Sequence, residues 1–80
     1  MGRARIVLTS GGRYSEGIDI SAITFVPSDA VWACELTDST GKVIASACGA
    51  DKTSQHIDLD TSADALNMTT ATNMSKVIIY

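Results

Sequence analysis

The stretch that decides the fold is AVWACELTDSTGKVIASAC, residues 30–48. Residues 30–37 alternate between two sets of side chains with period two, which is typical of a half-buried strand. The segment DSTG, residues 38–41, is a turn signal with aspartate first and glycine last, and the apolar run after it is expected to return as the partner strand. The stretch therefore predicts a β-hairpin whose core-facing side chains are Trp32, Cys34 and Leu36.

The register of this hairpin determines where its two cysteines lie. A three-residue loop with a glycine bulge puts Cys34 opposite Ser46, whereas a two-residue loop puts Cys34 opposite Ala45. Neither register sets Cys34 opposite Cys48, and a diagonal pair is usually too far apart for disulfide geometry. We therefore expect two reduced, buried thiols.

Strand signals continue on both sides of the hairpin. The apolar positions of residues 18–26 change parity near Ser21 and Ala22, which predicts a bulge or bend there. Residues 9–17, 49–53 and 61–64 are expected to be polar connections. The segments expected to form strands are residues 3–9, 18–26, 30–37, 42–48, 54–60 and 75–80, with residues 65–71 as a seventh strand or a short helical turn.

These signals predict an all-β fold, a small antiparallel β-sandwich or barrel of six to seven short strands. With 80 residues the chain is expected to be a single β domain. Within it, residues 1–17 form a basic N-terminal strand and glycine-rich loop, and residues 18–80 form the β-sandwich body. Because so small a domain buries little surface, assembly into a homo-oligomer is expected.

The net charge of −3 at pH 7 hides an asymmetry. Three arginines, Arg3, Arg5 and Arg13, precede the first acid, Glu16, and the rest of the chain is acidic. We expect these arginines and Tyr14 to contact a protein partner. Nucleic-acid binders usually present a basic face with interleaved aromatic side chains; the sequence shows none, so direct nucleic-acid binding is not expected. No segment reaches the roughly 18 apolar residues of a membrane span, so no membrane contact is expected. No apolar leader follows Met1, so synthesis in a reducing cytoplasm is expected.

The glycine-rich stretch TSGGRYSEG, residues 9–17, has the glycine spacing of a phosphate-binding loop. Such a loop needs a lysine and a hydroxyl residue directly after its second glycine, and it opens a helix. Here Ile18 and Asp19 follow Gly17, and a carboxylate at that position repels phosphate. The stretch therefore predicts a connection between strands.

One strand carries a candidate metal site. His56, Asp58 and Asp60 alternate along residues 54–60 and are expected to point to the same side. A solvent-facing strand side gives the same pattern, and no second histidine is present. The sequence has no nucleophile elbow, the motif that presents a catalytic serine. The Cys34 thiol is expected to be a core group beside Trp32 and Leu36. We therefore expect no catalysis and no cofactor.

Three stretches resemble small structural proteins of tailed bacteriophages: ISAITFVPSDAVWACELTDSTGKVIASA, SQHIDLD and MTTATNMSKVIIY. The resemblance covers roughly residues 18–80 and is one of β-sandwich layout. It implies a noncatalytic virion structural protein, such as a capsid decoration (cement) protein or another minor head or tail protein. Its expected partners are the major capsid protein or other virion subunits.

Two other function classes remain open from the sequence. One is a carbohydrate- or ligand-binding β-module, for example part of a tail or fibre, with Trp32 or Tyr14 as an apolar platform. The other is a small metal-binding protein that uses His56, Asp58 and Asp60.

Overall fold

A computed structural model of the chain describes residues 6–9 and 12–80; Arg3 and Arg5 lie outside the described residues. The prediction of an all-β fold is confirmed, and the number of described strands is eight rather than six or seven. The strands are β1 (Ile6–Thr9), β2 (Arg13–Tyr14), β3 (Ile18–Pro27), β4 (Trp32–Thr37), β5 (Val43–Gly49), β6 (Gln55–Ala63), β7 (Leu66–Thr72) and β8 (Met74–Ile79).

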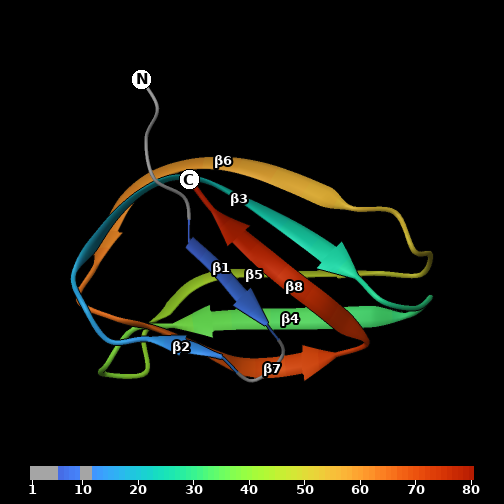
Figure 1. Ribbon diagram of the computed structural model, residues 1–80, viewed down its shortest axis with the longest axis horizontal. Helices are drawn as coiled ribbons and strands as arrows, with labels where there is room; N and C mark the ends of the chain where they lie inside the picture. Colours follow the sequence, from blue (N-terminus) through green and yellow to red (C-terminus); the bar gives the residue numbers. More distant parts are fainter. Residues whose placement is uncertain (1–5, 10–11) are drawn as a thin grey trace.

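The strands form two four-stranded antiparallel sheets, so the fold is a sandwich and not a barrel. Sheet A has the order β1-β8-β3-β6, and sheet B has the order β2-β7-β4-β5. In Figure 1, β1, β8 and β3 run obliquely across the more horizontal strands β4, β5 and β7 of the other layer. The core lies between the layers because each sheet turns its apolar side inward. Its largest fully buried side chains are Phe25, Ile20, Ile23, Leu36, Leu66, Ile79 and Val77.

The predicted hairpin is present as β4 and β5, and its predicted core side is confirmed. Trp32, Cys34 and Leu36 are 3%, 2% and 0% exposed. Near the turn the register matches that of the predicted three-residue loop, because the Asp38 amide donates to the Lys42 carbonyl oxygen at 2.9 Å.

Farther along, both predicted registers of Cys34 are wrong. A bulge lies between the pairs Thr37–Val43 and Leu36–Ala45, and it leaves Ile44 without a direct partner. The extra residue shifts the rest of β5 by one position, so that Cys34 lies opposite Ala47.

The two cysteines have different environments. Both thiols are free, as predicted; Cys34 is buried, whereas Cys48 is exposed, so the expectation of two buried thiols is wrong for Cys48. The bulge in β5 is the reason, because Cys48 now pairs with Ala33 on the outer side of sheet B. Burial raises the pKa of the Cys34 thiol to about 11.

The predicted bulge in residues 18–26 is confirmed within a single long strand, β3. The register against β6 shifts between Ile20 and Ala22. The backbone amide of the intervening Ser21 donates to the Tyr80 carbonyl at 2.7 Å, and its hydroxyl donates to the same oxygen at 3.1 Å. The shift lets Ile20 and Ile23, which have opposite parity, both face the core at 1% and 0% exposure.

Two predicted connections are wrong, and each error involves pairing between distant parts of the chain. Residues 61–63 continue β6 because they pair with residues 18–20 at the start of β3. The predicted loop over residues 9–17 contains β2, which pairs with Leu66 and Asn67. Of the two alternatives for residues 65–71, the seventh strand is confirmed: Leu66–Thr72 form β7, which pairs with β4 in the middle of sheet B.

Candidate functional site

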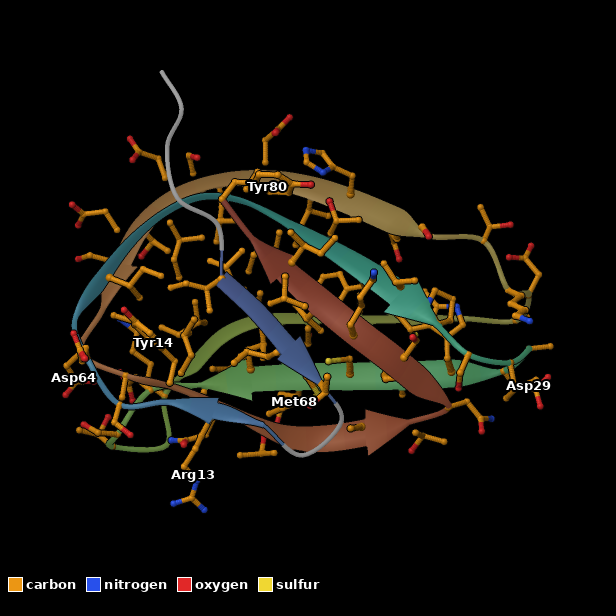
Figure 2. All side chains as sticks on the ribbon, in the orientation of Figure 1. Arg13, Tyr14, Asp29, Asp64, Met68 and Tyr80 are labelled. Carbon is orange, nitrogen blue, oxygen red and sulfur yellow. The ribbon has the colours of Figure 1, made fainter. Side chains whose placement is uncertain are left out.

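The predicted partner contacts Arg13 and Tyr14 lie next to each other on β2 but face opposite ways. Figure 2 shows the Arg13 side chain extending away from the sandwich, whereas Tyr14 turns back over it. Tyr14 is half-buried and packs against the core, while Arg13 is exposed. Side chains of successive strand residues point to opposite faces, so only Arg13 of this pair is presented outward.

Arg13 borders a hollow of about 470 Å³ between β2, β7 and the β4–β5 turn. Its other walls include Gly12, Thr37, Ser39, Asn67 and Thr69. Within residues 6–9 and 12–80, no carboxylate lies within ion-pair distance of Arg13. The hollow therefore holds one positive charge, Arg13, and one negative charge, Asp38, which lie farther apart than an ion pair.

Two aspartates hold the turn beside this hollow. Asp38 accepts hydrogen bonds from the Thr40 hydroxyl at 2.7 Å and from the Thr40 and Lys42 amides at 2.9 and 3.0 Å. The Thr40 hydroxyl is the main reason why the pKa of Asp38 lies below its ordinary value. All three bonds go to Oδ1 of Asp38, within its own turn.

The second aspartate joins two turns of the sandwich. Asp64, between β6 and β7, accepts hydrogen bonds from the hydroxyl and the backbone amide of Ser39. The Ser39 hydroxyl is the main cause that lowers the pKa of Asp64. Because Ser39 lies in the β4–β5 turn, this contact connects the start of β5 with the end of β6.

The candidate metal residues lie on the exposed side of β6, as predicted; His56 and Asp58 are in contact, but Asp60 lies apart from them. His56 Nε2 lies 3.2 Å from Asp58 Oδ1, and His56 Nδ1 lies 2.6 Å from the Thr24 hydroxyl. Asp60 borders a separate hollow of about 250 Å³ with Asp19, Ser21 and Tyr80. Among the described residues, no three His, Cys, Asp or Glu side chains are grouped closely enough to hold a metal ion.

Strand geometry explains this outcome. A strand rises about 3.3 Å per residue, so positions 56 and 60 are roughly 13 Å apart along β6. Ligand bonds of about 2 Å cannot bridge such a span around one ion. Three alternating residues of one strand share a face but need ligands from neighbouring strands to form a metal site.

Trp32 is a core residue and not a surface platform. Its ring stacks on Phe25, with centroids 6.2 Å apart and an interplanar angle of 28°. Gly49 lies so close that an added Cβ would be 2.6 Å from the Trp32 Nε1 atom. The sequence-based hypothesis that Trp32 is a surface platform for a sugar is therefore wrong. Cys34 is a core residue, as predicted.

The outer side of sheet B is a surface that the sequence analysis missed. Two rows of neighbouring side chains cross three strands: Thr72–Ala33–Cys48 and Thr70–Glu35–Ser46. We call these six residues the sheet B face. The only charge in it is Glu35, whose carboxylate accepts a hydrogen bond from the Thr69 hydroxyl at 3.1 Å.

The sheet B face is hollowed as well as nearly uncharged. A depression of about 350 Å³ is lined by Ala33, Glu35, Ser46, Cys48 and Thr70, among others. The sequence signal for this face was a set of mostly small residues at alternate positions, in segments 33–35, 46–48 and 70–72. Recognising the face required the order of the strands, because these residues come from distant parts of the chain.

Comparisons with known proteins identify no relative. No family model, curated protein or solved structure matches the chain. None of the described residues belongs to a helix that is long and apolar enough to span a membrane.

Proposed function

We propose that this chain is a noncatalytic structural protein that acts by binding other protein subunits. Its proposed setting is the virion of a tailed bacteriophage, where it packs on the major capsid lattice as an oligomeric decoration (cement) or minor head protein. The resemblance of residues 18–80 to small phage structural proteins supports the setting. The sheet B face supports binding as the mode of action.

The single observation that carries this proposal is the chemistry of the sheet B face. Its small side chains, including Ala33, Ser46 and Cys48, allow another protein surface to approach closely. Burying a charge in an interface is costly unless it is paired, and the only charge here is Glu35, which already accepts a hydrogen bond. By contrast, the outer side of β6 carries Asp58 and Asp60, which favour contact with solvent.

A sedimentation experiment tests the proposal. The purified chain is mixed with empty capsid shells of the phage that encodes it, and the bound fraction is measured after pelleting. We expect saturable binding that Ser46→Arg, in the sheet B face, weakens at least about tenfold, because it puts an unpaired charge into the interface. The matched control is Ser62→Arg, an exposed position on β6, which should bind like the unmodified chain.

Two outcomes contradict the proposal. A stable monomer that does not pellet with the shells removes the virion function. Equal binding by the Ser46→Arg and Ser62→Arg variants removes the sheet B face as the docking surface.

A further inference from the structure

Strand β5 is an edge strand with one open side. In sheet B it pairs with β4, and none of the other described strands pairs with it. The backbone N–H and C=O groups on the open side of an edge strand can therefore pair with an additional extended chain.

The four edge strands of the sandwich differ in length and charge. β2 has two residues and β1 has four, so both offer little backbone for pairing. β6 is long but carries Asp58 and Asp60 at exposed positions. β5 has seven residues and contains neither a charged residue nor a proline. Short strands, charges and prolines are the usual protections of an edge, so β5 lacks the common ones.

The inner side of the sandwich is incompletely covered beside β5. The core-facing residues of β5 are small: Ala45, Ala47 and Gly49 lie opposite Leu36, Cys34 and Trp32. Across the sandwich, Ile57 and Leu59 of β6 point toward the core but are only partly buried. Large apolar residues on a strand added beside β5 would cover Ile57 and Leu59 and contribute apolar burial.

The arrangement of the two layers limits what can be added. Figure 1 shows β6 lying beyond β5 on the same side of the sandwich. If β5 of a second copy paired with this β5, the two-fold symmetry of the pair would bring its own β6 into the space that this β6 occupies. A single extended segment avoids this clash because it brings no second layer.

We propose that the open edge of β5 binds an extended segment of another protein, which adds to sheet B as a fifth strand. The segment runs antiparallel to β5, as every neighbour in this sheet does. Its alternate side chains are large and apolar and face Ile57 and Leu59. Lys42 precedes β5, so an acidic residue at the C-terminal end of the segment matches it, whereas Asp51 and Lys52 after β5 balance each other and favour no charge at the N-terminal end of the segment.

The test uses a fluorescent peptide, Lys-Thr-Val-Thr-Ile-Thr-Val-Thr-Glu, titrated with the intact chain and followed by anisotropy. We expect saturable binding, and binding about threefold weaker for the peptide with its terminal Glu replaced by Lys, because the replacement places a like charge beside Lys42. Binding should also slow the reaction of the exposed Cys48 with a thiol reagent, since Cys48 lies on β5.

Variants distinguish the edge from the rest of the surface. Ala47→Lys places a charge on the inner side of β5 and should weaken peptide binding at least about tenfold, because inward-pointing charges protect edges. Ser46→Lys is the matched control on the outer side of the same strand and should bind normally. If Ala47→Lys fails to fold by circular dichroism, Leu59→Thr takes its place, with an expected weakening of at least about threefold from lost apolar cover.

Three results would overturn the proposal: no saturable binding of the first peptide, equal binding by Ala47→Lys and Ser46→Lys, or peptide binding that leaves the reaction of Cys48 unchanged. The proposal is independent of the virion function, because the peptide is assayed on the isolated chain without capsid shells.

Discussion

The edge strands β5 and β6 follow each other in the chain, yet their exposed positions have opposite chemistry. β6 carries His56, Asp58 and Asp60 on its solvent side, whereas β5 carries Ser46 and Cys48 there. Both strands have the same backbone potential for pairing with another chain. Charged side chains at exposed positions are one of the usual protections of an edge, so β6 has a protection that β5 lacks.

The largest expected effect comes from the core on which both edges depend. Phe25 is fully buried in β3 and stacks on Trp32 of β4, so it joins the two sheets. Phe25→Ala should lower the free energy of unfolding by about 3–5 kcal/mol, through lost burial and the cavity left behind. Urea denaturation measures this loss, and the surface control Ser62→Ala should stay within about 0.5 kcal/mol of the unmodified chain.

Hydrogen exchange of the Phe25→Ala variant then sharpens the comparison of the two edges. The amides of β5 and β6 should lose protection together, since both strands rest on one core. Loss of protection confined to one of the two strands would show that β5 and β6 do not depend on the same core contacts.

A smaller effect is expected at the end of β5. A Cβ on Gly49 would lie 2.6 Å from the Trp32 Nε1 atom, so Gly49→Ala forces the indole ring or β5 to move. We expect a loss of about 1–3 kcal/mol in the free energy of unfolding, as for other overpacked sites. Gly17→Ala is the control, because its nearest neighbour would be the Ala63 carbonyl oxygen at 3.8 Å. If both variants unfold at the same urea concentration, the packing of Trp32 on Gly49 is wrong.

The contact between Ser39 and Asp64 should make stability depend on pH. The pKa of Asp64 in the folded chain lies below its ordinary value of 3.8, so this contact stabilises the fold fully above that pH. The stabilisation is lost as the pH falls through the lowered pKa. We therefore expect the free energy of unfolding to decrease on acidification in this range.

Two substitutions isolate this part of the pH dependence. Asp64→Asn and Ser39→Ala should each give a shallower decrease in urea denaturation between neutral and acidic pH. A residual slope remains, because hydrogen bonds from Thr40 also lower the pKa of Asp38. An unchanged slope in both variants would show that Asp64 contributes nothing to the acid sensitivity.

The smallest effect is chemical and leaves the stability unchanged. A thiol reagent should modify Cys48 quickly in the folded chain, while Cys34 reacts only after unfolding, because burial shields it and raises its pKa to about 11. Counting modified thiols by mass spectrometry before and after denaturation gives one and then two. Modification of both thiols in the folded chain would contradict the burial of Cys34.

Local patterns predicted the features that depend on neighbouring residues. The alternation of residues 30–37 identified Trp32, Cys34 and Leu36 as core residues, and the change of parity near Ser21 identified the bulge in β3. The partner contacts Arg3 and Arg5 lie outside the described residues, and the binding roles of Arg13 and Tyr14 stay predictions. The sheet B face could not be predicted, because it combines residues of β4, β5 and β7.

The sequence by itself determined that this chain is built of strands, where its main hairpin turns and which side of that hairpin is buried, because alternation and turn residues act over a few positions. Only the tertiary structure decided the strand order, the one-residue shift that exposes Cys48, and the open edge of β5 beside Ile57 and Leu59. These features depend on contacts between residues far apart in the chain, which a local pattern does not specify.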